Sequence, residues 1–257
     1  MGSVLVAFSG GVDSSLLLAA ARDALGERVL AVTAVSPLLS ESEISWAGKV
    51  ASKLGARWME LPIPCLDSPY FLENPPDRCY QCKKELFSAL LRKADEEGLR
   101  TVVEGTQQDD LTDYRPGLRA LRELGIRSPF MELRLEKDQI RLMARDRGLP
   151  NWNRTSSACL ASRIPYGHAV TVEKLRRIAV CEAIIQEMGF SQVRVRDHGA
   201  VARIELLPSE MRHALDDSVL EAILTRCQEQ GFAYVTLDLR GYRTGSMNEA
   251  LPDEMRR

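Results

Sequence analysis

The sequence predicts an α/β fold in which a parallel sheet wound with helices is followed by a smaller α+β domain. Three observations support this prediction. Short apolar runs alternate with helical patterns along residues 1–152. The first apolar run ends in a glycine-bearing turn that opens directly into a helix. In residues 153–257 the order changes to a helix, two strands of alternating polarity, a second helix and a last strand.

The first domain contains four expected strands, each a short and mostly apolar run. They cover residues 4–8, 29–35, 57–61 and 101–104. The helical patterns between and after them lie at 16–21, 44–54, 84–94 and 137–147. This alternation is typical of a parallel sheet, whose ligands bind beyond the carboxyl ends of the strands. The segment LPNWN at 149–153 interrupts the pattern and marks the expected domain boundary.

The second domain is expected to contain helices at 171–188 and 217–230 and a strand at 234–239, with a hairpin between the helices. If His198 and Gly199 form the hairpin loop, one face of the two strands is apolar and packs on the helices. The opposite face is basic with one carboxylate, and it contains Arg194, Arg196, Arg203 and Glu205. A solvated surface and an anion or metal-phosphate site explain this face equally well.

Composition excludes some classes of protein. The 257 residues include 34 basic and 36 acidic side chains, so no global field attracts nucleic acid or a membrane. No apolar run approaches the length of about 18 residues that a membrane helix requires, and no leader pattern opens the chain. We expect a cytoplasmic protein, whose six cysteines serve as thiols, metal ligands or catalysts rather than as disulfides.

The first turn has the composition of a phosphate-binding loop. It reads SGGVDSS, and its glycines allow a tight turn and a close approach of an anion. Hydroxyl groups and free amides at the helix start would donate to that anion. No lysine stands in the turn, so it is not the lysine-containing nucleotide loop. It resembles the PP-loop of the ATP pyrophosphatases, an adenine nucleotide alpha-hydrolase-like fold whose members cleave ATP between the α and β phosphates; an ordinary glycine turn is the alternative.

The cysteines divide into two groups. Cys181 and Cys227 lie in apolar helical stripes and are expected in the core, whereas the role of Cys65 is undecided. Cys79 and Cys82 form a C-x2-C motif surrounded by cations, which favour thiolates. Such a motif is a redox pair or half of a zinc site, and a second pair is absent from the sequence.

One further cysteine stands in a polar setting. Cys159 lies between serines and Arg163, just after the expected boundary. Together with Cys79 and Cys82 it would provide the three thiolates that suit an iron-sulfur cluster with one open iron. A packed core thiol is the alternative for this residue.

Polar residues after the fourth strand belong beside the first loop. Gly105 and Thr106 follow directly, and the glycine would let a nucleotide approach closely. Asp109 or Asp110 would hold a phosphate-bound magnesium ion or cap a helix, and Asp13 has the same two interpretations.

A glycine-bearing loop follows the last strand. It contains Arg243 and Ser246, which suit a phosphate because arginine matches its oxygens. A plain surface loop explains the same residues.

Taken together, five segments resemble the LarE family, sulfur transferases that build the nickel-pincer nucleotide cofactor. The resemblance spans almost the whole chain and rests on SGGVDSS, RCYQCKKELF, EGTQQDD, ACLASRIPYG and LRGYRTGSMNEAL. It implies that ATP and magnesium adenylate a carboxylate of pyridinium-3,5-biscarboxylic acid mononucleotide, with release of pyrophosphate. A sulfur nucleophile then displaces AMP and leaves a thiocarboxylate.

The resemblance also implies roles for individual residues. It assigns the ATP phosphates to Ser9, Gly10, Gly11, Asp13, Ser14 and Ser15. It places Gly105, Thr106 and Asp109 near the nucleotide and Cys159 at the position of the sulfur-bearing cysteine, with Asp13 and Arg163 as further catalytic residues. In the second domain it assigns a divalent metal to Glu182 and Glu205, and the substrate phosphate to Arg194, Arg243 and Ser246.

The source of the sulfur distinguishes two forms of this family. One form sacrifices the sulfur of a single cysteine, whereas this sequence resembles the form in which three cysteines hold a 4Fe-4S cluster with an extra sulfide. The resemblance implies that Cys79, Cys82 and Cys159 are these ligands, that sulfide or another sulfur donor reloads the cluster, and that the protein is a homo-oligomer. Sacrifice of the Cys159 sulfur is the alternative.

Three other functions remain open. A tRNA thiolase would need a basic surface, which the balanced charge does not favour, so we expect no nucleic-acid partner and no membrane partner. An amide-forming ATP pyrophosphatase would not need three suitably placed cysteines. A nucleotide and iron-sulfur sensor would bind ATP without turnover.

Overall fold

The computed structural model describes residues 1–112, 115–155, 158–243, 245–252 and 254. Thr244, which belongs to the last of the segments compared above, and Ser156 and Ser157, which precede Cys159 in the sequence, lie outside these ranges. Internal contacts divide the chain into two compact units. Of the described residues, the N-terminal unit comprises 1–71 and 77–155, and the C-terminal unit comprises 72–76 and those from 158 onward.

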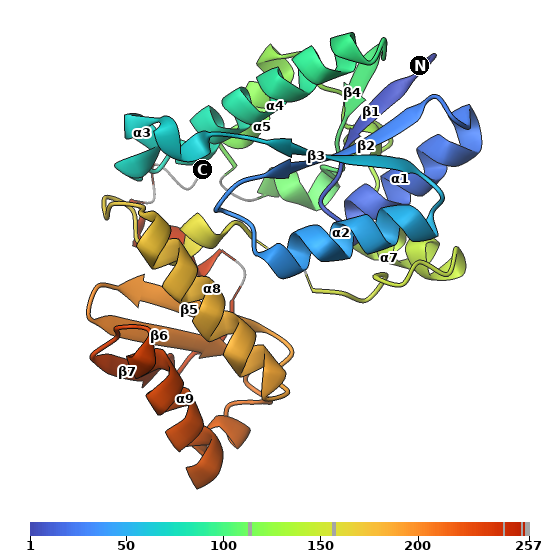
Figure 1. Ribbon diagram of the computed structural model, residues 1–257. Helices are drawn as coiled ribbons and strands as arrows, with labels where there is room; N and C mark the ends of the chain where they lie inside the picture. The colour runs from blue at the N-terminus through green and yellow to red at the C-terminus, as the bar shows by residue number, and fades with distance from the viewer. Residues whose placement is uncertain (113–114, 156–157, 244, 253, 255–257) are drawn as a thin grey trace. The chain divides into compact units, whose positions relative to one another are not determined.

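The N-terminal unit is built on a parallel sheet of four strands, which confirms the predicted fold class (Figure 1). The strands are β1 (Val4–Ala7), β2 (Val29–Val35), β3 (Arg57–Pro62) and β4 (Thr101–Val103), in the order β3-β2-β1-β4. The central strand β1 pairs with both β2 and β4, so that Val6 lies opposite Ala31 on one side and Val103 on the other. The carboxyl ends of β1 and β4 therefore meet at one edge of the sheet.

Helices cover both faces of this sheet, because its central strands are apolar on both sides. Val4 and Val6 pack into a core with α1 (Val12–Leu25), α2 (Glu41–Lys53) and α7 (Lys137–Asp146). Leu5 faces the opposite core, formed with α4 (Arg78–Glu96) and α5 (Gly117–Glu123). Short helices complete the connections: α3 (Pro69–Leu72), α6 (Pro129–Glu132), and 3-10 turns at Cys65–Asp67 and Gln108–Thr112. No helix among the described residues is long and apolar enough to cross a membrane.

Helix α4 begins six residues earlier than expected. The predicted range of 84–94 rests on the apolar positions Phe87 and Leu90, which pack against the sheet. The first turn of the helix is polar and follows Asp77, so no hydrophobic periodicity marks it. Cys79 and Cys82 consequently lie inside the helix and not in a loop before it.

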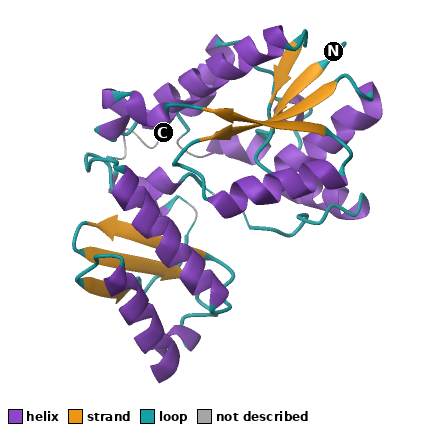
Figure 2. Ribbon diagram, viewed as in Figure 1, coloured by secondary structure: helices purple, strands orange, loops and turns teal. Residues whose placement is uncertain are grey.

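The C-terminal unit packs two helices on one face of a three-stranded sheet (Figure 2). The helices are α8 (Val172–Glu187) and α9 (Asp217–Glu229), and the strands are β5 (Val193–His198), β6 (Val201–Leu206) and β7 (Tyr234–Leu237). Strand β6 is central, antiparallel to β5 and parallel to β7. Three 3-10 turns lie at Leu160–Arg163, His213–Leu215 and Ser246–Ala250.

The hairpin between β5 and β6 differs from the prediction in its loop and not in its faces. Gly199 and Ala200 form the loop, because His198 pairs with Val201. The side chain of Asp197 accepts the Gly199 backbone N–H at 2.9 Å, which favours the turn one residue later than expected. Arg194 pairs with Glu205 in the structure, whereas the predicted loop would pair it with Arg203. This shift of two residues keeps every side chain on its predicted face.

Candidate active site

The phosphate loop joins the carboxyl end of β1 to the start of α1. Gly10 has a φ of +70°, and a Cβ atom at this position would lie 2.8 Å from the Cα atom of Ala47. Gly11 precedes the helix and has no side chain to cap it, so the first N–H groups of α1 stay available to an anion. The Ser14 hydroxyl donates to the Gly11 carbonyl at 3.2 Å and accepts the Ser9 backbone N–H at 3.3 Å.

Two side chains from distant segments hold the loop through the Gly10 carbonyl. Trp46 Nε1 donates to the Gly10 carbonyl at 3.1 Å, and Asn151 Nδ2 donates to the same oxygen at 2.8 Å. Asn151 Nδ2 also donates to Ser15 Oγ at 2.9 Å. Ser15 is fully buried, so its hydroxyl faces Asn151 and the interior, whereas Ser9 is exposed at the mouth of the loop. Sequence reasoning missed both supporting residues, because neither belongs to a local motif.

Asp13 and Asp109 each contact Lys137, a residue that sequence reasoning also missed. Lys137 Nζ lies 2.7 Å from Asp13 Oδ1 and 2.6 Å from Asp13 Oδ2. The backbone N–H of the same lysine donates to Asp109 Oδ2 at 3.1 Å. Lys137 is the first residue of α7, where the helix dipole disfavours a cation. This local anomaly is the signal that could have marked the residue.

The end of β4 lies against the phosphate loop, as expected from the strand order. A Cβ atom on Gly105 would lie 3.1 Å from the Asp13 Cβ atom and 3.1 Å from the Ser14 nitrogen. The buried Glu104 carboxylate accepts the Thr106 backbone N–H at 3.1 Å and the Thr106 hydroxyl at 2.6 Å, and it also accepts the Ser128 hydroxyl. The Thr106 hydroxyl therefore fixes the backbone after β4.

The six cysteines differ in burial. Cys181 and Cys227 are buried in the core of the C-terminal unit, as predicted. The hydrogen bond that the Cys181 thiol donates to Cys227, together with burial, raises the pKa of Cys181. Cys65 is buried as well, and burial raises its pKa. Because all three thiols are buried, a substrate or a metal ion cannot reach them.

The other three cysteines are accessible. Cys79 and Cys159 are exposed and Cys82 is half-buried. Cys79 and Cys82 are three residues apart in the first turn of α4, a spacing that places both thiols on one side of a helix. Cys159 immediately precedes the turn Leu160–Arg163. The three residues expected to hold a cluster are thus the three whose thiols can be reached.

In the C-terminal unit, Arg163 fixes the backbone around Cys159. Its guanidinium donates to the carbonyl oxygens of Ala158 at 2.6 Å and of Cys159 at 3.1 Å. It also forms a bidentate ion pair with Glu182, at 2.9 and 2.8 Å. Both side chains are buried, and Glu182 additionally accepts the Val195 backbone N–H at 2.9 Å.

A second buried pair lies on the basic face of the hairpin. Arg196 donates to both oxygens of Glu205, at 3.0 and 2.6 Å, and to Ser246 Oγ at 2.8 Å. Arg203 reaches the same carboxylate at 3.2 Å. Arg194 is buried beside them, 5.3 Å from the centroid of the Tyr242 ring. Burial, reinforced by the neighbouring Arg163 and Arg196, lowers the pKa of Arg194.

Arg243 is held by carboxylates. It pairs with Glu249 at 2.8 and 3.0 Å and with Asp238 at 3.4 Å. The ion pair with Glu249 raises the pKa of Arg243 above its ordinary value. Ser246 lies three residues further along the chain and is buried against Glu205. An anion that binds to Arg243 would displace the carboxylate of Glu249, which is half-exposed.

The arrangement in this unit fits an anion better than a divalent metal. Glu182 and Glu205, the expected metal ligands, each form a bidentate pair with an arginine. Within each unit, the residues that the structure describes include no group of three His, Cys, Asp or Glu side chains placed to hold a metal ion. Positive charge predominates around the two carboxylates, because they are surrounded by Arg163, Arg194, Arg196 and Arg203.

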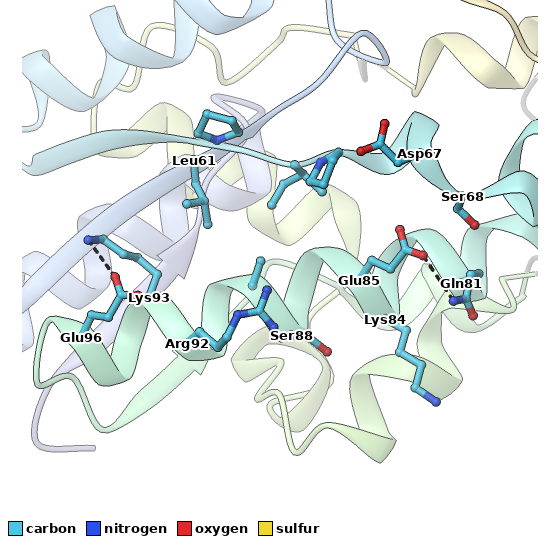
Figure 3. Close-up of a pocket in the computed structure, with 14 residues that line it drawn as sticks. Leu61, Asp67, Ser68, Gln81, Lys84, Glu85, Ser88, Arg92, Lys93 and Glu96 are labelled. Carbon is cyan, nitrogen blue, oxygen red and sulfur yellow. Dashed lines mark hydrogen bonds and ion pairs between the residues drawn. The ribbon is translucent and has the colours of Figure 1, made fainter.

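A groove of about 690 Å³ lies elsewhere in the N-terminal unit, between β3 and α4 (Figure 3). Its lining contains charges of both signs: Lys93 pairs with Glu96 at 3.3 Å, and Glu85 accepts a hydrogen bond from Gln81 at 3.3 Å. None of its described lining residues belongs to the phosphate loop. We therefore place the candidate active site at the loop and not in this groove.

Comparison with known proteins identifies relatives over nearly the whole length of the chain. The asparagine synthase family model matches residues 2–65, which contain the phosphate loop. An uncharacterized protein of Synechocystis sp. is 42% identical over 96% of this chain and 92% of its own. The pyridinium-3,5-bisthiocarboxylic acid mononucleotide synthase of Lactiplantibacillus plantarum is 39% identical over 96% of this chain and 90% of its own. The B subunit of an Archaeoglobus fulgidus GMP synthase is 25% identical over 72% of this chain and 65% of its own.

Proposed function

The chain belongs to the LarE family of ATP-dependent, PP-loop sulfur transferases, and on this premise we propose that it converts a carboxylate of pyridinium-3,5-biscarboxylic acid mononucleotide into a thiocarboxylate. The observation that carries the proposal is the phosphate loop at the carboxyl end of β1, with Gly105 packed against Asp13 and Ser14. Adenylation requires a bound triphosphate, and the free N–H groups of α1 offer a site for it.

The N-terminal unit would perform the activation step. The substrate carboxylate attacks the α-phosphorus of ATP, an acyl-phosphate bond forms, and the bond to the pyrophosphate leaving group breaks. Asp13 and Asp109 are the carboxylates that we assign to Mg²⁺, which would take the place of the Lys137 ammonium group on Asp13. Mg²⁺, when bound, would neutralise the negative charge of the phosphates.

The basic face of the C-terminal unit would bind the phosphate of the pyridinium mononucleotide. Arg194, Arg243 and Ser246 are the residues that we assign to this role, and Arg196 joins Ser246 to Glu205. The carboxylates of Glu182 and Glu205 would orient arginines here, because both are engaged by guanidinium groups. The divalent metal that the sequence suggested for them is therefore not part of the proposal.

Sulfur transfer would follow on the activated carboxylate. We propose that Cys79, Cys82 and Cys159, the three accessible cysteines, hold a 4Fe-4S cluster. The cluster, when bound, would supply a replaceable sulfide. Arg163 would support this step by fixing the carbonyl groups of Ala158 and Cys159, and thereby the backbone that carries the Cys159 thiol.

Anaerobic turnover with mass analysis tests the proposal. The protein, purified without oxygen, is incubated with ATP, Mg²⁺, sulfide and the pyridinium mononucleotide, and AMP, pyrophosphate and thiocarboxylate are quantified. We expect several thiocarboxylates per chain and an unchanged intact mass. Loss of one hydrogen sulfide from Cys159 after a single turnover would establish sacrifice of that sulfur. ATP binding without pyrophosphate release for any pyridinium carboxylate would contradict the enzymatic proposal and favour a sensor.

A further inference from the structure

The half-buried Arg154 stacks on Trp46, a residue that contacts the phosphate loop. The guanidinium carbon of Arg154 is 4.8 Å from the centroid of the Trp46 ring. The indole N–H of Trp46 donates to the Gly10 carbonyl at 3.1 Å. The guanidinium of Arg154 is therefore connected to the loop through one stacked ring and one hydrogen bond, although neither Arg154 nor Trp46 belongs to a recognised motif.

No carboxylate in the described part of the chain forms an ion pair with Arg154. Within the described ranges, its side chain forms no ion pair and no hydrogen bond. Glu43 acts on it only at longer range, and the Glu43 carboxylate accepts the Ser40 backbone N–H at 3.4 Å. The Arg154 side chain is half-buried, and this burial lowers its pKa. Holding a partly desolvated cation without a partner costs free energy, and an anionic ligand would recover it.

The backbone that carries Arg154 is fixed before any ligand binds. Arg141 donates to the carbonyl oxygens of Trp152 at 3.1 Å and of Arg154 at 3.1 Å. Asn151, in the same segment, is bound to the Gly10 carbonyl and to Ser15. The segment 151–154 is thus attached to the phosphate loop at one end and to α7 at the other. Because the segment is already ordered, little conformational entropy would be lost on binding a ligand.

The phosphate loop lacks a cation of its own. It contains no lysine, and the ammonium group of Lys137 is occupied by Asp13. ATP carries several negative charges in a small volume, which calls for further cations. A guanidinium that stacks on an indole ring keeps its N–H groups free at its edge, where they match phosphate oxygens. We propose that Arg154 is a phosphate-binding residue of the ATP site, positioned by Trp46 and by the segment that Asn151 anchors.

Calorimetric titration with Mg-ATP, in the absence of the pyridinium substrate, tests this assignment without turnover. We expect Arg154→Ala to weaken ATP binding by about 10- to 100-fold, the usual effect of losing a hydrogen bond between charged groups. Arg154→Lys should lie between wild type and Arg154→Ala. Arg154→Met, which keeps the apolar contact with Trp46, should bind ATP as weakly as Arg154→Ala.

Arg145 offers a matched control. Its guanidinium carbon is 6.0 Å from the centroid of the Trp152 ring, but its side chain is 55% exposed and pairs with Asp146 at 3.6 Å. Arg145→Ala should therefore bind ATP as wild type does. Adenosine, which lacks phosphate, should bind equally to wild type and to the Arg154 variants. An equal loss of adenosine affinity would instead indicate a collapsed site and overturn the assignment.

The inference rests on the proposed function, and the same titration separates the two. If wild type does not bind ATP, the proposed function fails. If wild type binds ATP and both Arg154→Ala and Arg154→Met bind it equally well, only the role of Arg154 is refuted. Loss of Arg154 leaves no buried carboxylate unpaired, so we expect the melting temperatures of the variants to stay close to that of wild type.

Discussion

Lys137 and Asp13, 124 residues apart in the chain, form a bidentate contact in which the ammonium nitrogen lies 2.7 and 2.6 Å from the two carboxylate oxygens. Both side chains are only about a quarter exposed, at 25% and 28%. The contact attaches the start of α7 to the start of α1 at the phosphate loop. It keeps a positive charge beside the site where a triphosphate would bind, and it holds the carboxylate that Mg²⁺ would use.

Replacement of Lys137 by alanine should impair activation of the substrate. It removes the counter-ion of Asp13 and leaves an uncompensated carboxylate beside the phosphates of ATP. We expect the rate of substrate-dependent pyrophosphate release to fall by about 10- to 100-fold. Lys93, which pairs with Glu96 and Glu97 on the surface, is a suitable control, and Lys93→Ala should retain the wild-type rate. An unchanged rate in Lys137→Ala would show that its contact with Asp13 is only structural.

The two glycines of the phosphate loop should respond differently to alanine. Gly10→Ala combines a positive φ with a Cβ atom 2.8 Å from the Ala47 backbone, so it should lower the free energy of unfolding by about 2–4 kcal/mol. Gly11 has a φ of −73°. A Cβ atom added at this position would lie 3.4 Å from Ser9 Oγ, its nearest neighbour. Gly11→Ala should therefore change stability by less than about 1 kcal/mol. Urea denaturation distinguishes the two, and equal effects would contradict the observed loop conformation.

Glu104 should support both stability and nucleotide binding. Its carboxylate accepts three hydrogen bonds from Thr106 and Ser128, and all three residues are buried. Glu104→Ala leaves these donors without a partner, and we expect a loss of about 2–3 kcal/mol in the free energy of unfolding. The KM for ATP should rise as well, because the Gly105 backbone beside the loop loses its support. Ser128→Ala removes one donor only and should have a smaller effect on both measurements.

The layers of the fold were predictable because burial leaves a simple pattern in the sequence. Strands β1 and β2 are almost continuously apolar, since helices cover both of their faces, and this is typical of a parallel sheet. The faces of the hairpin were predicted correctly even though its loop was not, because an error of two residues in register does not move a side chain to the other face. The loop itself depends on one side-chain contact, from Asp197 to the Gly199 backbone N–H.

The residues that sequence reasoning missed act over long distances in the chain. Asn151 reaches Gly10 across 141 residues, and Asn74 donates from a left-handed backbone conformation to the Pro165 carbonyl across 91 residues. Such contacts depend on how distant segments pack together, so a local periodicity in the sequence does not predict them. The phosphate loop was recognisable because its chemistry is concentrated in seven consecutive residues. The supporting residues that were missed, Trp46, Lys137 and Asn151, come from three other segments.

The difference in burial among the six cysteines allows the proposed cluster ligands to be tested, with the three buried cysteines as controls. Cys79→Ala, Cys82→Ala and Cys159→Ala should each abolish the visible iron-sulfur absorbance of anaerobically purified protein and the formation of thiocarboxylate. ATP binding should persist in all three, because none of these thiols belongs to the phosphate loop. Cys65→Ala, Cys181→Ala and Cys227→Ala remove buried thiols of comparable size and should retain the absorbance, with a modest loss of stability. If Cys79→Ala and Cys82→Ala kept both absorbance and turnover, these two residues would not be cluster ligands, and the C-x2-C motif would have another role.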